Sequence, residues 1–231
     1  VRPKEKGRSI VCKLGKQKLV EDFSPPNANV RSRVHEYGGG AYIVENGELW
    51  FSNGEDGRVW HKSFNGNTFP ITSKSKSRYA DFVRDSSRGR LIAIAEDHQE
   101  IKTKPNNRLV AIRETGDVNI LAEGADFYSS PKVSADGRWL SWLSWDHPCM
   151  PWDGTSLWLA PIATDGAVGE RVLVAGGSKE SIFQPEFAPD GTLYFVSDRS
   201  GWWNLYRIKA GEIELVLALD AECGVPQWSF G

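Results

Sequence analysis

The chain has 231 residues, 25% of them charged, and a formal net charge of −2. This balance indicates neither nucleic acid nor an anionic membrane as a partner, because both attract chains with a clear positive excess. The sequence contains no run of about 18 apolar residues, so no membrane-spanning helix is predicted.

The three cysteines are Cys12, Cys149 and Cys223, which lie far apart and form no CxxC pair. Neither a metal site nor a disulfide framework is therefore expected, and nothing in the sequence indicates another cofactor. Reduced, mostly buried thiols favour a cytoplasmic protein.

Taken in chain order, the first predicted elements are two short strands within residues 8–23. A longer unit follows at 38–73, with four predicted strands and a turn at Asn46-Gly47 between the first two. The same order of strands, with a glycine in the same turn, recurs three more times, over 79–124, 128–177 and 182–219. The last segment, 226–231, matches only the first strand of such a unit.

A repeat of four antiparallel strands in about 40–50 residues has the size of a propeller blade. Glycine suits the tight turns because they need a positive φ. The predicted fold is therefore all-β: a β-propeller of four-stranded antiparallel blades, with four whole blades and parts of two others. Since both ends match only part of a blade, we expect a truncated part of a larger propeller. Another copy in a homo-oligomer, or an absent domain, would cover its exposed edges.

Several long motifs resemble one group of propellers. FAPDGTLYFVSDRSGWWNLY (187–206) resembles the repeat of TolB- and tricorn-type propellers, which is also found in the N-terminal propeller of the prolyl oligopeptidase family of serine peptidases. VHEYGGGAY (34–42) and SWDHPCMPWDGTSLW (144–158) are similar to the acylaminoacyl-peptidase and dipeptidyl-peptidase-like branch. The resemblance extends from about residue 30 to residue 231 and implies a parent propeller of seven or eight blades.

The resemblance implies a function that is shared with a second domain. In the family, an α/β-hydrolase domain follows the propeller and supplies a serine in a G-x-S-x-G motif. This chain has no such motif, so the hydrolase domain is absent and no catalytic residue is assigned. The chain would gate and orient short peptides for the hydrolase domain of the same polypeptide. The alternative is a free-standing TolB-like interaction propeller, and a sugar- or polyanion-binding propeller ranks below both.

The first candidate binding residues are Arg33, Glu36 and Tyr37, just before the glycines at 38–40. This position is predicted to lie near the central channel, where glycine permits a close approach of the backbone. Glu36 could pair with a substrate amine and Arg33 with a carboxylate. The competing interpretation is a structural turn that holds an internal ion pair.

The second candidates are Trp152 and Asp153, in the long connection between the second and third strands of a unit. They could form a lip that faces the substrate or the hydrolase domain. Alternatively, Trp152 anchors the loop and Asp153 begins a turn before Gly154.

One acidic position recurs near the end of the second strand in all four units. A structural role is expected for it, because a carboxylate can cap the turn that follows. The four residues are Asp56, Asp97, Asp146 and Asp198.

Overall fold

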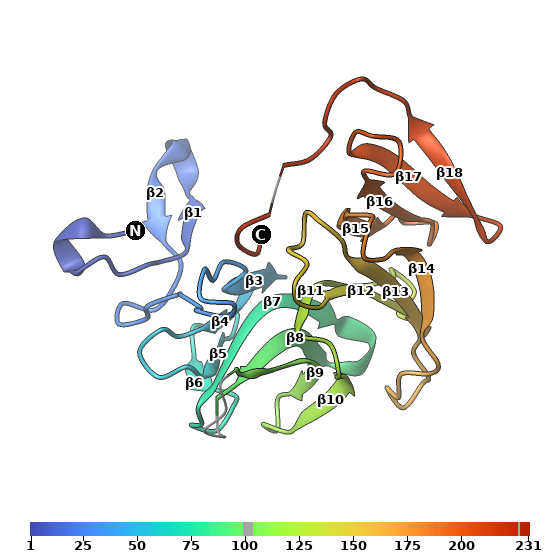
Figure 1. The fold of residues 1–231 in the computed structure, drawn as a ribbon. Coiled ribbons are helices and arrows are strands. Elements are labelled where there is room, and N and C mark those ends of the chain that lie inside the picture. Colours follow the sequence, from blue (N-terminus) through green and yellow to red (C-terminus); the bar gives the residue numbers. More distant parts are fainter. Residues whose placement is uncertain (99–103, 226) are drawn as a thin grey trace.

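The computed structural model describes residues 1–98, 104–225 and 227–231. Within them, four antiparallel four-stranded sheets follow one another along the chain (Figure 1), which confirms the predicted fold class. No helix in the described residues is long and apolar enough to cross a membrane. The short 3₁₀ turns are η1 (Pro3–Glu5), η2 (Lys16–Lys18) and η3 (Ser86–Arg88).

Each sheet is a meander in which sequential strands are neighbours. The first two sheets contain β3 (Tyr42–Glu45), β4 (Glu48–Ser52), β5 (Val59–Lys62) and β6 (Thr68–Pro70), then β7 (Ser77–Asp85), β8 (Arg90–Asp97), β9 (Asn106–Arg113) and β10 (Val118–Ala122). The next two contain β11 (Phe127–Val133), β12 (Trp139–Trp145), β13 (Ser156–Pro161) and β14 (Val172–Gly176), then β15 (Ile182–Phe187), β16 (Leu193–Ser197), β17 (Asn204–Lys209) and β18 (Glu212–Leu217). An antiparallel pair precedes them, β1 (Cys12–Leu14) with β2 (Val20–Asp22).

The glycine turns between first and second strands have the backbone that the sequence predicts. Each of these glycines has a positive φ, which an L-residue with a Cβ adopts only at a cost. The values are 80° at Gly47, 60° at Gly89, 70° at Gly137 and 86° at Gly191.

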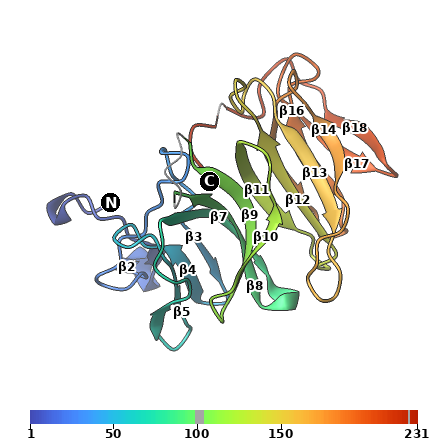
Figure 2. The same ribbon diagram turned by 60° about the horizontal axis from the view of Figure 1, so that its bottom comes forward.

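The apolar core is divided among the spaces between sheets. Trp50 of the first sheet packs with Leu91 of the second, and Ile94 of the second packs with Trp142 of the third. Figure 2 shows the sheets in a row, face against face, with β2 at one end and β18 near the other. Because an inner blade is covered on both faces, its strands are apolar on both faces and alternate poorly.

The first strands of the last three sheets share a bulge, and two of these bulges join a sheet to the one before it. The pairing register shifts in β7, β11 and β15, and at these shifts Asp81, Ser130 and Gln184 have φ values of 56°, 53° and 45°. The Asp81 amide donates to Gly40 O (2.8 Å), and the Ser130 amide donates to Asp81 Oδ2 (2.5 Å). These bonds connect the first three sheets around their inner edge.

The recurring aspartates differ from the prediction. Asp56 does cap the turn that follows it, by accepting from the amide of Arg58 (3.0 Å). Asp146 and Asp198 instead accept from the amides of Asp126 (2.6 Å) and Ser181 (2.8 Å), which precede the first strands of their own sheets. The capping interpretation is therefore wrong for these two, because their carboxylates reach across the sheet rather than along the chain.

The cysteines also differ from the prediction of mostly buried thiols. Cys12 and Cys223 are exposed and Cys149 is half-buried, and all three are free. Cys12 lies in β1, whose three residues are all exposed, so its side chain has no sheet to pack against.

The C-terminal segment turns back into the centre of the molecule (Figure 1). Pro226, the first residue of the predicted partial blade, lies outside the described residues. Phe230 is 7% exposed and makes one parallel bridge with Gly39. The Phe230 backbone lies so close to Gly39 that a Cβ at position 39 would clash with it. The segment thus lies against the turn that precedes β3.

A buried ionic cluster ties the second sheet to the third. Asp85 is fully buried and pairs with Arg88 (3.0 Å) and Arg90 (2.8 Å). Arg88 also donates through Nε to Ala163 O (3.0 Å) and through Nη1 to Gly137 O (2.9 Å), both in turns of the third sheet. One aspartate therefore orients an arginine that crosses between blades.

We expect Asp85→Ala to lower the free energy of unfolding by about 3–5 kcal/mol, because it leaves the buried Arg90 unpaired. Urea unfolding followed by circular dichroism measures the change. The control is Asp165→Ala, since Asp165 is exposed and accepts only from the Ala167 amide (2.9 Å). Equal losses in the two variants would contradict a central role for the cluster.

Candidate functional site

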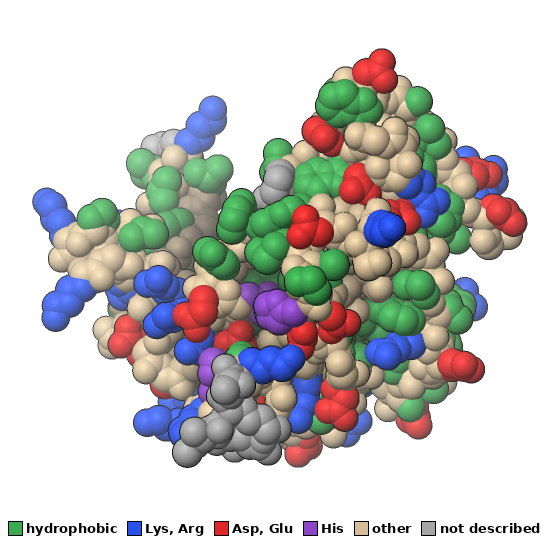
Figure 3. All heavy atoms as spheres, viewed as in Figure 1, with side chains coloured by type: hydrophobic (Ala, Val, Ile, Leu, Met, Phe, Trp, Pro, Cys, Tyr) green, Lys and Arg blue, Asp and Glu red, His purple; other side chains and the backbone are tan. Residues whose placement is uncertain are grey.

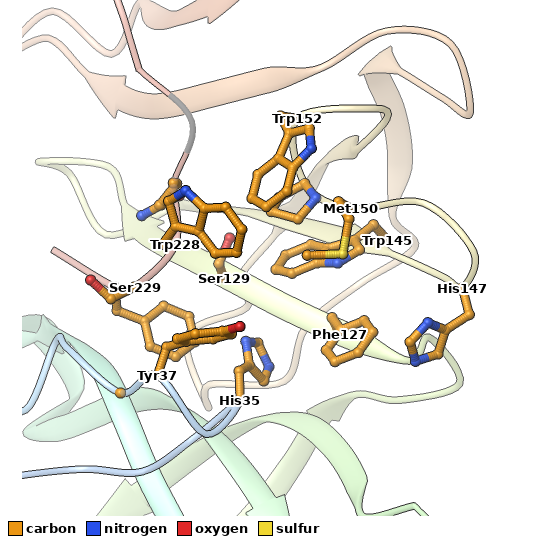
Figure 4. A pocket seen from close by; sticks show the side chains of 14 residues that line it. His35, Tyr37, Phe127, Ser129, Trp145, His147, Met150, Trp152, Trp228 and Ser229 are labelled. Atoms are coloured by element: carbon orange, nitrogen blue, oxygen red, sulfur yellow. The ribbon is translucent and has the colours of Figure 1, made fainter.

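An aromatic pocket of about 230 Å³ opens at the inner edge of the blades. Its side chains come from the 35–38 turn, β11, the loop between β12 and β13, and the C-terminal segment (Figure 4). In Figure 3, hydrophobic side chains gather around the centre of this face, beside a histidine. Four parts of the chain that are distant in sequence thus meet at one apolar depression.

Aromatic rings form most of the pocket wall. The Trp228 ring centroid lies 4.5 Å from that of Trp152 and 5.7 Å from that of Tyr37. Phe127 and Trp145 stack on the opposite side, with centroids 5.4 Å apart. Tyr37 is 64% exposed and Trp228 is 56% exposed, so a large aromatic surface remains open to a ligand.

His35 lies between the two sides of the pocket. Its ring contacts Phe127 (5.0 Å between centroids), Trp145 (5.6 Å) and Phe230 (4.9 Å). Burial lowers the pKa of His35 to about 4. The ring is therefore neutral at physiological pH and adds no charge to the apolar wall.

A network of ion pairs braces the turn that carries His35. Arg33 and Arg78 both pair with Glu36, each at 2.7 Å, and Arg78 Nη1 also lies 3.2 Å from the buried carboxylate of Glu96. The hydrogen bond from Arg78 holds the pKa of Glu36 below its usual range, and Arg33 adds to this effect. Glu96 Oε2 accepts from the His35 amide (2.7 Å), so the network holds the turn through its backbone as well.

The structure separates the predicted site residues into three groups. Tyr37 and Trp152 line the aromatic pocket, and both contact Trp228. Arg33 and Glu36 belong to the ion-pair network beside it. Asp153 accepts from the Met150 amide (2.9 Å) and so closes a turn that begins at Met150, rather than beginning one before Gly154.

Sequence reasoning missed several residues of the pocket wall. Trp228 is the most important, since it contacts both of the predicted aromatic residues. Phe127, Trp145 and His35 were likewise not among the predicted site residues, although all three line the pocket. The one available signal was the high aromatic content of the segments 144–158 and 226–231.

No group of three or more His, Cys, Asp or Glu side chains that could hold a metal ion occurs in residues 1–98, 104–225 and 227–231. The pocket also offers little polar surface for a charged ligand, since its only ionisable side chains are Tyr37, His35 and His147. What it offers instead is apolar contact for a side chain of roughly aromatic size.

The fold defines a β-propeller of four-stranded blades, an architecture shared with TolB. A putative TolB from Agrobacterium tumefaciens covers 87% of this chain with a TM-score of 0.59, and the chain covers 66% of it. The two sequences are 13% identical, so this likeness concerns the fold alone.

A closer likeness identifies the kind of propeller. The chain is a propeller domain that matches the propeller portion of puromycin hydrolase, a peptidase of the prolyl oligopeptidase family, with 33% identity and a TM-score of 0.89. A puromycin-hydrolysing peptidase from Mycobacterium tuberculosis is 31% identical, also with a TM-score of 0.89. Each match covers 100% of this chain, which spans 38% of the length of either relative. No family model and no curated protein matches the chain.

The neutral His35 leads to a testable prediction. We expect an NMR titration of its ring to have a midpoint of about 4, below the ordinary value of 6.5. His35→Asn assigns the signal, and asparagine tolerates the positive φ of 54° at this position. A midpoint near the ordinary value would show that the ring is not buried in the pocket wall.

The lowered pKa of His35 also affects how the free energy of unfolding depends on pH. The unfolded chain binds more protons at His35 between about pH 4 and pH 6.5, so His35 makes the folded state less stable as the pH falls through this range. Asp81 acts in the opposite direction, because burial raises its pKa to about 6. Comparing the pH dependence of urea unfolding between the wild-type chain and His35→Asn isolates the first effect, and the variant should lose less stability on acidification.

Proposed function

We propose that this chain is the non-catalytic propeller portion of a serine peptidase that acts on short peptides. It gates and orients the substrate for a C-terminal α/β-hydrolase domain of the same polypeptide. The observation that carries the proposal is the match of the whole chain to the propeller portion of puromycin-hydrolysing peptidases. The aromatic pocket gives this role a physical basis.

The pocket suits an apolar or aromatic side chain. Burial of apolar surface contributes about 25 cal/mol per Å², and contacts between aromatic rings add about 0.5–1.5 kcal/mol. The walls formed by Tyr37, Trp152 and Trp228 would hold such a side chain from two directions. Puromycin carries aromatic groups and is therefore the first ligand to test.

The position of the pocket favours selection of small substrates. It lies at the inner edge of the blades, with the Gly38–Gly40 turn and Phe230 beneath it. Flanking loops leave a depression of about 230 Å³, which admits a side chain but not a folded domain. A peptide held there by one side chain would have a defined orientation.

We expect Trp228→Ala to weaken puromycin binding by about tenfold or more, because the substitution removes the ring that contacts both Tyr37 and Trp152. Quenching of tryptophan fluorescence, with calorimetry for confirmation, measures the affinity. Trp139→Ala is the matched control, since Trp139 is 38% exposed and lies outside the pocket. Unchanged affinity in Trp228→Ala, or equal losses in both variants, would argue against the pocket as the binding site.

The division of labour between two domains needs the parent polypeptide. We expect a fluorophosphonate probe to label a product of the native gene that is much heavier than 25.7 kDa, and to leave the 231-residue chain unlabelled. An unlabelled native product of about this mass would refute the peptidase proposal. The free-standing TolB-like interaction propeller would then be the better account.

A further inference from the structure

A second pocket, of about 390 Å³, lies between the first and second sheets. Its lining comes from the segments 29–33, 52–57 and 75–79. Arg33 lines this pocket and Tyr37 lines the aromatic one, so a single short turn separates them. We call the second pocket the cationic pocket, after Arg31, Arg33, Lys76 and Arg78.

The charges of the cationic pocket are not balanced. Its only lining carboxylate is Asp56, which is already paired with Arg58 (2.8 Å) and accepts from Trp60 Nε1 (3.2 Å). Arg33 and Arg78 share the carboxylate of Glu36, as described above. Glu55, at the rim, accepts from Asn29 Nδ2 (2.9 Å) and is not part of the lining.

Two cations remain without a counter-ion. Arg31 and Lys76 make no ion pair with any residue that the structure describes, although both line the same cavity as Arg33 and Arg78. Glu36 and Glu96 compensate Arg33 and Arg78, whereas the charges of Arg31 and Lys76 repel each other, and an anion between them relieves that repulsion. Cations that are merely solvated at the surface need not line the same cavity, whereas these four do.

Two buried residues of the cationic-pocket lining already have hydrogen-bond partners in the protein. Ser52 is 2% exposed and donates to Tyr79 O (2.5 Å), which joins the two sheets below the pocket. Asn53 is 9% exposed, and its Oδ1 accepts from the Asn29 amide (3.3 Å). This part of the lining therefore offers few free hydrogen-bonding groups, and the cations are what a ligand would meet.

We infer that the cationic pocket binds the carboxylate group of a peptide ligand, with Arg31 and Lys76 as its counter-ions. Guanidinium and ammonium groups form charge-assisted hydrogen bonds with a carboxylate, and arginine can do so with two parallel bonds. This inference deepens the proposed function and rests on it: a short peptide with one side chain in the aromatic pocket would reach the cationic pocket across the 33–37 turn. The carboxylate belongs either to the peptide's C-terminus or to an acidic side chain.

The test uses the 231-residue chain and ligands that differ in a single charge. N-acetyl-Gly-Gly is titrated into the ¹⁵N-labelled chain beside N-acetyl-Gly-Gly amide, which lacks the carboxylate. We expect N-acetyl-Gly-Gly to shift the backbone N–H signals of Lys76 and Ser77. N-acetyl-Gly-Gly amide should leave these signals unchanged. The α-amide of N-acetyl-aspartic acid carries its carboxylate only on the side chain, so comparing it with N-acetyl-Gly-Gly distinguishes the two sources.

The variant Arg31→Ala/Lys76→Ala should weaken binding of the acid by about tenfold, which corresponds to the loss of two charge-assisted contacts. Lys74→Ala is the matched control: it also removes a positive charge from the same loop, and Lys74 does not line the pocket. Equal binding of acid and amide, absence of any shift, or an equal loss in Lys74→Ala would overturn the inference.

One further ligand separates this inference from the proposed function. N-acetyl-phenylalanine amide has an aromatic side chain and no carboxylate, so it tests the aromatic pocket alone. If N-acetyl-phenylalanine amide binds while N-acetyl-Gly-Gly and N-acetyl-Gly-Gly amide behave alike, the carboxylate inference fails and the aromatic pocket keeps its role. If it does not bind while the acid shifts Lys76, the aromatic pocket fails and the cationic pocket stands.

Discussion

The buried carboxylate of Glu96 holds the turn on which both pockets depend. It is 3% exposed as a side chain, accepts from the His35 amide and lies next to Arg78 and His98. The turn itself is unfavourable for an ordinary chain, because His35 and Glu36 have φ values of 54° and 63°. A negative charge buried below the turn and a guanidinium beside it compensate for that backbone cost. The result is a fixed wall with an aromatic face on one side and a basic face on the other.

Neighbouring residues of the 33–37 turn have different roles in this arrangement. Tyr37 presents its ring to the aromatic pocket, His35 fills the space below it, and Arg33 faces the cationic pocket. Glu36 is in neither lining and instead pairs with two arginines. A short peptide would therefore meet one apolar and one basic surface within the same few residues, which is a sufficient basis for orientation.

The sequence predicted what is local and repeated. Positive φ values at Gly47 and Gly137, four strands in each unit and a core between blades all follow from short-range patterns. The aromatic pocket could not be predicted in this way, because Trp228 and Tyr37 contact each other although most of the sequence lies between them. The error over Asp146 has the same origin, since its partner, the amide of Asp126, becomes a neighbour only after β11 and β12 pair. An internal ion pair in the turn was foreseen as an alternative, but the second arginine on Glu36, Arg78, was not.

The division of the core into spaces between sheets has a consequence for how the chain opens. The packed clusters lie between neighbouring sheets, so stability is approximately a sum of nearest-neighbour terms, as in other repeat architectures. The first three sheets have a packed cluster on either side, whereas among the described residues β15–β18 contribute to one cluster, shared with the third sheet, and leave Leu215 and Leu217 about half exposed. Opening should therefore begin at the fourth sheet, and the cationic pocket, which is lined by segments of the first two sheets and the residues before them, should persist in forms where only the fourth sheet has opened.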